Sequence, residues 1–520
     1  MSFQLCPYYS VQFPEEINCL DNFFDFSFLD EYSKFVSNFE ETCKKYSNRD
    51  LCKAEVEQIL DAEFENTYQN FLENIKNKNI IILVPDLWIG GFGDFIFAVK
   101  ISQIFKEKIQ NVNVAIVIPI EEHLTKIKSI LTDDSSEINN IYTYDTLPEN
   151  FRNERGLCIG AAGFFNYRSK LFGFYYHSLN LKSDYECLSI PEYSCIQHQN
   201  IYYSKTKVPG LKRNEYGILI DKEISEIADK IKDEKKDPIS FLEDLTDTQL
   251  KTDIKEDNVP ITEYSKNTKL YFGYGHEIKS QIHFIRLVAS LEKNNANNVD
   301  LVLILDIPNQ LECFLHINIT EELLEKGFTE IEIMPSEDND QSYKILSDTF
   351  KKKLRIIPRK TISQKDFKTC IIMSQPFCLI TGDQSFSEAV SANKYFIYEL
   401  YQHKYLFNES VRDLANELKL FLVRQYLIDT AVPVLNFEFR AIARKWKFEF
   451  PLKKTSENYD ETISKYLLNQ DFISEWQKFI RYIKEERSLN KKIVSFVIKI
   501  LAESSFPYLK LRPILRSTFH

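Results

Sequence analysis

The sequence predicts an α/β protein with two tandem Rossmann-like domains, each built on a parallel sheet, and helical extensions at both ends. From Asn79 onward, a short β-branched run, "IIILV", is followed by "FIFAVKISQIFKEKI", in which apolar residues recur at helical spacing. The same alternation starts again at Lys269 with "KLYFGYG" and continues to "KYFIYEL", which ends at Leu400. Strands and helices that alternate at this spacing form βαβ units and therefore parallel sheets.

The patterns divide the chain into four segments. Residues 1–78 contain no glycine and predict a helical N-terminal extension, and residues 79–265 an N-terminal domain with a charged helical insertion at about 222–258. Residues 266–408 predict a C-terminal domain, in which Gly327 ends a helix and "SYKILSDTFKKK" forms another. From 409 to 520 the pattern is helical and, from 440 on, basic.

Composition excludes several classes of protein. A net charge of −11 argues against a general nucleic-acid binder. The cysteines form no CxxC pair, which favours reduced thiols in a cytosol over a zinc site or a disulfide scaffold. The N-terminus lacks the pattern of a signal peptide, and carboxylates interrupt the most apolar window, so we expect a cytoplasmic protein. The basic segment from 440 is either a solvated helical face or a peripheral contact for an anionic membrane or an acidic partner.

The first stretch with chemical interest is "GGFGD", which places Gly90, Gly91 and Gly93 directly before Asp94 in a chain with only 13 glycines. A dinucleotide-binding fingerprint would need a third glycine where Ile96 stands, and no GxxxxGK[ST] phosphate loop is present. The stretch instead predicts a tight strand-to-helix turn that a ligand can approach closely. Asp94 is either the N-cap of that helix or a residue with a chemical role.

The second stretch begins at the end of a buried strand, where Gly382, Asp383, Gln384 and Ser385 open a helix that carries Glu388. Free backbone amides at a helix start, with polar side chains beside them, suit a phosphorylated ligand. A well-capped helix with a surface carboxylate fits the same residues. The next strand end adds Tyr401 and Gln402.

The third stretch is "LYFGYGHE", at the first strand end of the C-terminal domain. Its glycines permit close approach of a ligand, and Phe272, Tyr274 and His276 offer rings that stack or form hydrogen bonds. His276 is either structural or in direct contact with a ligand. A basic run, "RIIPRK" from Arg355 to Lys360, adds positive charge that we place near the base of a nucleotide donor.

Together the three stretches resemble inverting glycosyltransferases of the GT-B fold, in particular bacterial protein-arginine rhamnosyltransferases and heptosyltransferases. The "GD" turn of these families carries a catalytic base, and Asp94 stands at the matching place. The family's Gly-Glu-Asp-Ser-Phe is similar to Gly382-Asp383-Gln384-Ser385-Phe386 here, and Tyr401-Gln402 matches its Tyr-Pro-Gln region. Asp383 stands where the family has glutamate, Gln384 where it has aspartate, and Thr381 where it has arginine.

The resemblance implies a hexosyl- or deoxyhexosyltransferase that moves a sugar from a nucleotide-sugar co-substrate to an acceptor, with inversion and without a metal or other cofactor. It implies Asp94 and Asp383 as catalytic residues. The implied donor-binding residues are Gly91, Gly93, Phe272, Tyr274, His276, Gly382, Gln384, Ser385, Glu388, Tyr401 and Gln402. Domain closure over the donor would exclude water.

The acceptor implied is a protein side chain, and the location is the cytoplasm, or a host cytosol if the protein is a translocated bacterial effector. One alternative is a non-catalytic interaction protein on a degenerate GT-B scaffold, which the altered residues Thr381 and Gln384 favour. Another is a different α/β enzyme that acts on a phosphorylated small molecule.

Overall fold

The computed structural model describes most of the chain between residues 78 and 505, and everything below concerns those residues. The ranges are 78–84, 93–118, 121–131, 138–154, 156–161, 176, 178–182, 185–190, 193–194, 208–213, 215–255, 259–304, 317–335, 342–346, 352–401, 404–434 and 459–505. The predicted N-terminal extension, Gly91 and Gln402 lie outside them.

The N-terminal sheet has five parallel strands in the order β3-β2-β1-β4-β5. The strands are β1 (Asn79–Leu83), β2 (Asn113–Val117), β3 (Ile141–Tyr142), β4 (Gly156–Ala161) and β5 (Tyr185–Ile190). The first strand, β1, is buried along its whole length, as expected for the centre of a sheet covered on both faces. The helices of this half are α4 (Gly93–Lys108), α5 (Glu122–Ile130) and α6 (Glu149–Asn153).

The C-terminal sheet repeats this arrangement. Its central strands, in the order β10-β7-β6-β11-β12, are β6 (Thr268–Tyr274), β7 (Asn298–Ile304), β10 (Lys353–Arg359), β11 (Phe377–Thr381) and β12 (Tyr395–Leu400). When only these five central strands are numbered along the chain, both sheets follow the doubly wound order 3-2-1-4-5. The edges are extended by β8 (Glu330–Ile333) and β9 (Tyr343–Leu346) on one side and by β13 (Ala431–Pro433) on the other. The predicted fold class of two tandem parallel-sheet domains is confirmed.

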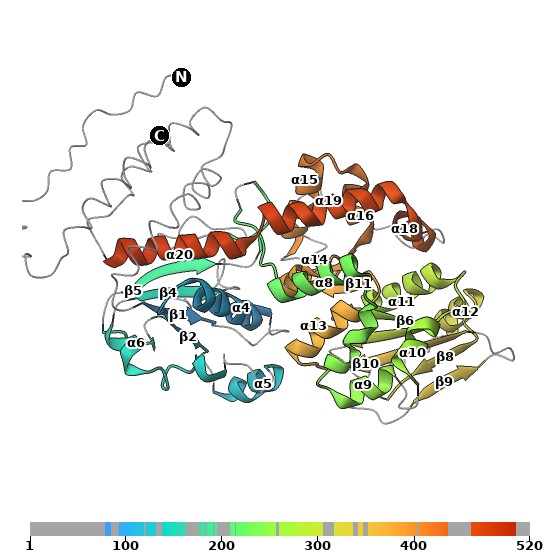
Figure 1. Cartoon of the computed structure of the whole chain (residues 1–520), viewed down its shortest axis with the longest axis horizontal. Coiled ribbons are helices and arrows are strands. Elements are labelled where there is room, and N and C mark those ends of the chain that lie inside the picture. Colours follow the sequence, from blue (N-terminus) through green and yellow to red (C-terminus); the bar gives the residue numbers. More distant parts are fainter. Residues whose placement is uncertain are drawn as a thin grey trace, which may run out of the picture.

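The remaining helices fill the connections and both faces of the C-terminal half, except the last, which returns to the N-terminal sheet (Figure 1). They are α8 (Lys222–Glu234), the 3-10 helix η3 (Pro238–Asp244), α9 (Thr248–Ile254), α10 (Ile261–Asn267), α11 (Ile278–Glu292), α12 (Ile317–Glu325), α13 (Gln364–Met373), α14 (Gly382–Ser391), α15 (Tyr405–Glu417), α16 (Phe421–Thr430), α18 (Tyr459–Leu468), α19 (Gln470–Glu486) and α20 (Leu489–Ser505). As predicted, α12 ends before Gly327, which has a φ of +89°. No helix in the described ranges is both long and apolar enough to cross a membrane.

One predicted helix is wrong. Residues 343–346 form β9, an antiparallel strand paired with β8, where the sequence pattern predicted a helix over 342–353. Their side chains alternate between half-buried and exposed, which is the period of a strand, and Lys344 forms an ion pair with Glu330 across the two strands. Pairing at the sheet edge outweighs the weak helical period of so short a segment.

The charged stretch predicted as an insertion packs against the C-terminal sheet. Thr246 donates its hydroxyl hydrogen to Asp366 of α13 (2.7 Å), and the guanidinium of Arg355 on β10 donates to the carbonyl of Ile254 (2.6 Å). These contacts place η3 and α9 beside the second sheet, although the chain reaches it only at β6. The boundaries at residues 265 and 408 stay predictions.

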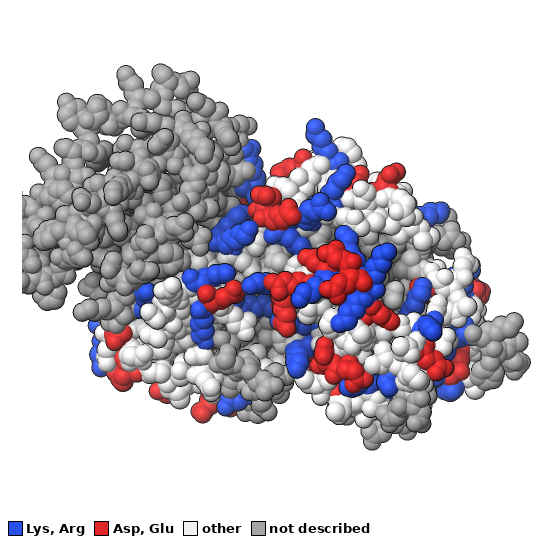
Figure 2. Space-filling view, in the orientation of Figure 1, with Lys and Arg blue, Asp and Glu red and all other residues white. Residues whose placement is uncertain are grey.

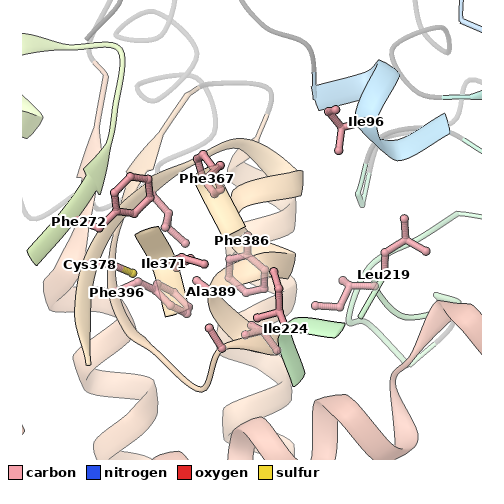
Figure 3. Close-up of a cluster of buried hydrophobic side chains, with 14 of the residues drawn as sticks. Ile96, Leu219, Ile224, Phe272, Phe367, Ile371, Cys378, Phe386, Ala389 and Phe396 are labelled. Carbon is pink, nitrogen blue, oxygen red and sulfur yellow. The ribbon is translucent and has the colours of Figure 1, made fainter. Parts of the chain in front are cut away.

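The two halves form one hydrophobic unit. A single cluster of buried side chains includes Ile80 and Ile96 of the N-terminal half together with Phe386 of the C-terminal half (Figure 3). The last helix, α20, follows α19 and lies along the N-terminal sheet (Figure 1). Ile218 pairs with Ser488 just before α20, so the chain end ties the two halves together a second time.

Candidate active site

Two helix N-termini meet between the sheets. Helix α4 begins at Gly93, in the connection that leaves β1, and α14 begins at Gly382, directly after β11. A Cβ atom placed on Gly93 would lie 4.0 Å from the Cβ of Gln384. Because β1 and β11 lie where the strand order of each sheet reverses, both helix starts lie where ligands bind in doubly wound sheets. The first and second sequence stretches are thus brought into contact.

Asp94 is the second residue of α4 and is half-buried. It lies inside the first turn of the helix and does not precede the first helical residue, as an N-cap would. The partial positive charge of the helix start favours an ionised carboxylate there. Asp94 therefore lies at the domain junction, in the helix turn that meets the start of α14.

The first turn of α14 is open. Gly382 has a φ of +76°, which is strained for other residues, and a Cβ placed there would meet no atom of the described residues within 4 Å. Thr381 precedes the helix without forming a side-chain cap. The Ser385 hydroxyl instead donates to the carbonyl of Thr381, one turn back. The Thr381 side chain therefore does not cap the first turn of α14.

Neighbouring helix starts are already occupied. At α11 the carboxylate of Glu399 accepts hydrogen bonds from the backbone N–H groups of His276 and Glu277, both at 2.8 Å. At α13 the Ser363 hydroxyl oxygen accepts from the backbone N–H of Asp366 (3.0 Å). Of the helices that follow β6, β10 and β11, α14 is therefore the one whose start can receive an anion.

Asp383 lies beside this open turn and holds a cation there. Its Oδ2 atom is 2.9 Å from Nζ of Lys404 and accepts a hydrogen bond from the backbone N–H of Tyr193, also 2.9 Å. The Lys404 side chain is only 8% exposed, so the ion pair is largely removed from water. Tyr193 comes from the segment after β5, which brings a third part of the chain to the start of α14.

Three of the predicted aromatic residues gather at neighbouring strand ends. The ring centroids of Tyr274 and His276 are 5.2 Å apart, and those of His276 and Tyr401 are 6.0 Å apart, both edge to face. The Tyr274 hydroxyl is 3.5 Å from Nε2 of His276. We call these three residues the aromatic group.

Phe272 does not belong to this group. It is fully buried and packs edge-on against Phe367 of α13, at a centroid distance of 5.0 Å. It points to the same face of β6 as Tyr274, two residues further on, but lies deeper in the core. A Cβ on Gly273 would approach Leu303 to 2.9 Å and Phe284 to 3.0 Å, so that glycine makes room for the core and not for a ligand. In this conformation Phe272 can influence a donor only through its neighbours.

Glu388 is buried as well, with 1% of its surface exposed. Its Oε1 atom accepts hydrogen bonds from Nζ of Lys100 (2.8 Å), Nε2 of Gln364 (2.6 Å) and Nε2 of Gln384 (2.9 Å). Because the amide nitrogen of Gln384 donates to this carboxylate, its Oε1 is the free end, and this atom has no hydrogen-bond partner among the described residues. Glu388 thus lies under the junction, and Gln384 connects it to the candidate site.

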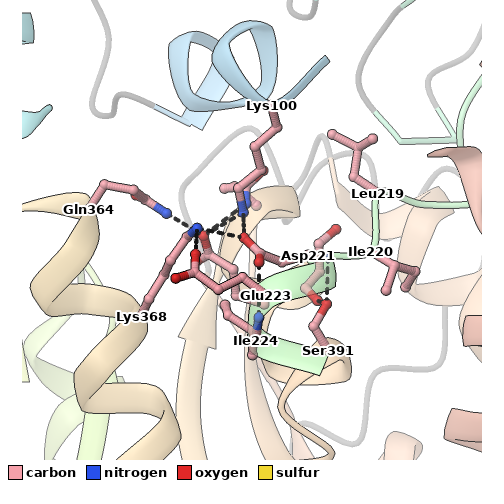
Figure 4. A network of polar contacts seen from close by, with 12 residues as sticks. Lys100, Leu219, Ile220, Asp221, Glu223, Ile224, Gln364, Lys368 and Ser391 are labelled. Atoms are coloured by element: carbon pink, nitrogen blue, oxygen red, sulfur yellow. Dashed lines mark hydrogen bonds and ion pairs between the residues drawn. The ribbon is translucent and has the colours of Figure 1, made fainter. Parts of the chain in front are cut away.

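Lys100 extends this network to Asp221, whose Oδ2 is 2.9 Å from the same ammonium (Figure 4). Asp221 is the N-cap of α8, and its Oδ1 accepts from the backbone N–H of Ile224. Its Oδ2 also pairs with Lys368 of α13 (3.2 Å). We call Lys100, Asp221, Gln364, Lys368, Gln384 and Glu388 the junction network.

Burial raises the pKa of Asp221, but the ammonium groups of Lys100 and Lys368 outweigh burial and hold the pKa well below its usual range. Asp221 is therefore ionised at neutral pH. The lowered pKa of Asp221 raises the free energy of unfolding fully only at pH values where this aspartate is also ionised in the unfolded chain.

We expect this contribution to be lost in acid. Because the folded-state pKa of Asp221 lies below the unfolded value of about 3.9, the contribution is complete above that pH and declines as the pH falls toward the folded pKa. The free energy of unfolding should therefore decrease more steeply from about pH 5 to about pH 3 in the native protein than in Asp221→Asn. Denaturant titrations at each pH measure both slopes. Asp145→Asn, at an exposed position, should keep the native slope, and equal slopes for all three proteins would contradict the assignment.

Sequence reasoning missed Lys100, Asp221, Tyr193 and Lys404. Lys100 had a signal, because it interrupts the apolar run "FIFAVKI" on a face where every neighbour is buried. A charged residue inside such a run indicates a buried partner. The other three gave none, since their partners are distant in the chain.

The basic run 355–360 does not supply free charge. Nε of Arg355 donates to Asp300 (2.7 Å), and Arg359 pairs with Asp253. Both arginines are buried. The expectation that this run supplies positive charge to a donor base is therefore wrong for the two arginines, because carboxylates of β7 and α9 neutralise them.

On the face shown in Figure 2, basic and acidic side chains of the described residues are intermixed along the domain junction. The part of the basic C-terminal segment that the structure describes consists of α18, α19 and α20. Residues 440–458 and 506–520 lie outside it. The expected contact of this segment with a membrane or an acidic partner stays a prediction.

No protein-family model and no curated protein matches the sequence. Among solved structures, MurG from Acinetobacter baumannii is similar with a TM-score of 0.40 and 10% identity, covering 81% of this chain and 99% of that one. The structure that describes EarP-mediated arginine glycosylation of translation elongation factor EF-P gives a TM-score of 0.37 and 11% identity, covering 80% and 98%. A glycosyl transferase of family 9 from Veillonella parvula gives 0.34 and 10%, covering 75% and 97%. At these scores the likeness carries no argument about the reaction, and the architecture rests on the two sheets themselves.

Proposed function

We propose that this protein is a glycosyltransferase that moves a sugar from a nucleotide-sugar donor to an acceptor by an inverting, metal-independent mechanism. The observation that carries the proposal is the meeting of two complementary groups across the domain junction. A half-buried residue, Asp94, lies in the first turn of α4, and the start of α14 at Gly382, which the Thr381 side chain does not cap, lies beside it. A base opposite an anion site is the arrangement that inverting transfer from a diphosphate requires.

The donor diphosphate is assigned to the open first turn of α14. Its amides and helix dipole attract anions, and Gly382 leaves room for a phosphate to approach. The ion pair of Lys404 and Asp383 lies beside this turn, and the Asp383 carboxylate neutralises the Lys404 ammonium in the absence of a donor. The aromatic group offers rings on which the nucleoside packs.

Transfer follows from these positions. Asp94 removes a proton from the nucleophilic atom of the acceptor, and that atom forms a bond to the anomeric carbon from the side opposite the diphosphate. The bond from the anomeric carbon to the phosphate oxygen breaks, and the nucleoside diphosphate leaves with the electron pair. Configuration inverts because attack and departure occur on opposite faces. The protein side chain proposed as acceptor, and a hexose or deoxyhexose as the transferred sugar, rest on the resemblance of the three stretches to protein-arginine rhamnosyltransferases.

The first experiment is a binding and turnover screen. The full chain is incubated with UDP-glucose, UDP-N-acetylglucosamine, GDP-mannose and dTDP-rhamnose, and both the melting temperature and the release of nucleoside diphosphate are measured. We expect one donor to raise the melting temperature and to be hydrolysed slowly, with water as acceptor. If none of them binds, the transferase proposal fails. Binding without turnover, with or without a protein acceptor, would favour the non-catalytic scaffold.

Gly382→Ala tests the phosphate site. The new methyl group enters the open space beside the first amides of α14, so we expect donor affinity to fall by about tenfold, with a loss of stability of about 1 kcal/mol from the positive φ. Titration calorimetry with the donor found in the screen measures the affinity. Gly327→Ala is the matched control, because Gly327 also has a positive φ but lies at the end of α12. Unchanged affinity in Gly382→Ala would place the diphosphate elsewhere.

A further inference from the structure

We infer that Lys100 is a positioning residue for the proposed transfer, because it sets the place of Asp94 relative to the donor site on α14. This inference rests on the proposed function and adds to it a residue that touches neither donor nor acceptor. Asp94 and Lys100 belong to the same helix, six residues and about 9 Å of helical rise apart. Asp94 and Lys100 belong to the N-terminal half, whereas the proposed donor site belongs to the C-terminal half.

The contact between the two helices has two parts along their length. At the front, the first turns meet at Gly93 and Gln384. Behind this point, Nζ of Lys100 is 2.8 Å from Oε1 of Glu388, which lies one turn after Gln384. The amide of Gln384 donates to the same Oε1 atom and connects the rear contact to the front one. A shift of Lys100 therefore displaces either the carboxylate or the residue that faces Gly93.

The Lys100 ammonium is also held by a second carboxylate, that of Asp221 at the start of α8. Nζ of Lys100 is 2.9 Å from Oδ2 of Asp221, and the backbone N–H of Asp221 donates to the Ser391 hydroxyl at the end of α14 (2.9 Å). The two carboxylates thus hold one ammonium from two directions. Both ends of α14 are thereby tied to the first helix of the other half.

We expect the buried ion pairs of Lys100 to define the relative position of α4 and α14 and to add little to the free energy of unfolding. Lys100 is 8% exposed, and removing its ammonium and the two carboxylates from water offsets most of the energy that their attraction supplies. Apolar side chains of both halves belong to one buried cluster, and apolar contacts tolerate a small slip of one helix along another. An ammonium held by two carboxylates defines the register, as buried polar groups do between packed helices.

Lys100→Met removes the charge while keeping a side chain of similar length. Because the donor is held by α14 and the C-terminal half, we expect its dissociation constant to stay within about twofold of the native value. The turnover number for hydrolysis of the donor found in the screen should fall by about 10²-fold, since a displacement of about 1 Å costs about that much. Lys100→Arg retains the cation and should recover at least a tenth of native turnover. Lys108→Met, at an exposed position near the end of α4, should keep native turnover.

The outcomes separate this inference from the function it rests on. If the native protein binds and hydrolyses no donor, both fall. If the native protein hydrolyses a donor, three results would overturn the positioning role alone. Lys100→Met could keep native turnover, or its donor affinity could fall in proportion to its turnover. The third such result is that Lys100→Arg loses as much turnover as Lys100→Met. Should Lys100→Met fail to fold, Glu388→Gln carries the test. A loss of turnover with donor affinity retained would support positioning, whereas a loss of donor affinity would place Glu388 on the donor and overturn it.

Discussion

Replacing Asp94 by asparagine is expected to lower transfer or hydrolysis of the nucleotide sugar by about 10²–10⁴-fold, the usual contribution of a general base. The substitution keeps the size of the side chain and its place in the first turn of α4, but an amide cannot accept the acceptor's proton. The donor should still bind, because its proposed contacts lie on α14 and the aromatic group. Turnover is measured as release of nucleoside diphosphate, and binding by calorimetry.

The control must separate catalysis from the helix dipole. Removing a carboxylate from a first turn lowers stability by about 0.3–1 kcal/mol in itself. Asp471→Asn makes the same change in the first turn of α19, at an exposed position, and should lose similar stability with turnover unchanged. If Asp94→Asn retains native turnover, Asp94 serves only the helix start, as the capping interpretation of the sequence holds.

The largest loss of stability is expected from Gly217→Ala. Gly217 has a φ of +92°, and a Cβ there would lie 2.1 Å from the backbone carbonyl oxygen of Arg487, just before α20. Backbone strain and overlap with a backbone atom together should lower the free energy of unfolding by about 3–5 kcal/mol. The protein could relieve the overlap only by moving the backbone at Arg487, which would displace α20 from the N-terminal sheet. The side chain of Arg487 opposes such a movement. Its guanidinium donates to the carbonyls of Leu211 and Lys212.

Gly327→Ala distinguishes strain from overlap. Its φ is +89°, but the nearest atom to its Cβ is the carbonyl oxygen of Lys293 at 3.9 Å, so only the strain of about 1–2 kcal/mol applies. Denaturant unfolding measures both variants, and hydrogen exchange of α20 reports whether the helix is displaced. Equal losses in the two variants, with α20 protected, would contradict the tight contact at Arg487.

Local patterns were enough to predict the elements that form the candidate site. The apolar runs at Ile80–Val84 and at Phe377–Thr381 predicted β1 and β11, and a glycine followed by an aspartate predicted each helix start. These predictions succeeded because central strands of a parallel sheet are apolar throughout and turns after them need glycine. The segment 343–346 failed, because a short edge strand is decided by its partner β8 and not by its own pattern.

Burial at the site was not predictable in the same way. Phe272 and Tyr274 lie on one face of one strand, and Phe367 of α13 packs against both rings, yet only Tyr274 at the strand end reaches the aromatic group. Glu388 looked like a ligand-binding carboxylate at a helix start. The structure directs it to Lys100, a residue 288 positions away in the chain.

The sequence by itself determined two parallel α/β halves and two glycine-aspartate turns at their strand ends, because periodicity and glycine usage are local properties of the chain. Only the tertiary structure decided that these turns face each other, that Lys404 lies beside α14, and that a buried ammonium joins α4 to Glu388 of α14. Those facts depend on pairs of residues far apart in the chain. Their contacts follow from the packing of whole helices, which no local pattern encodes.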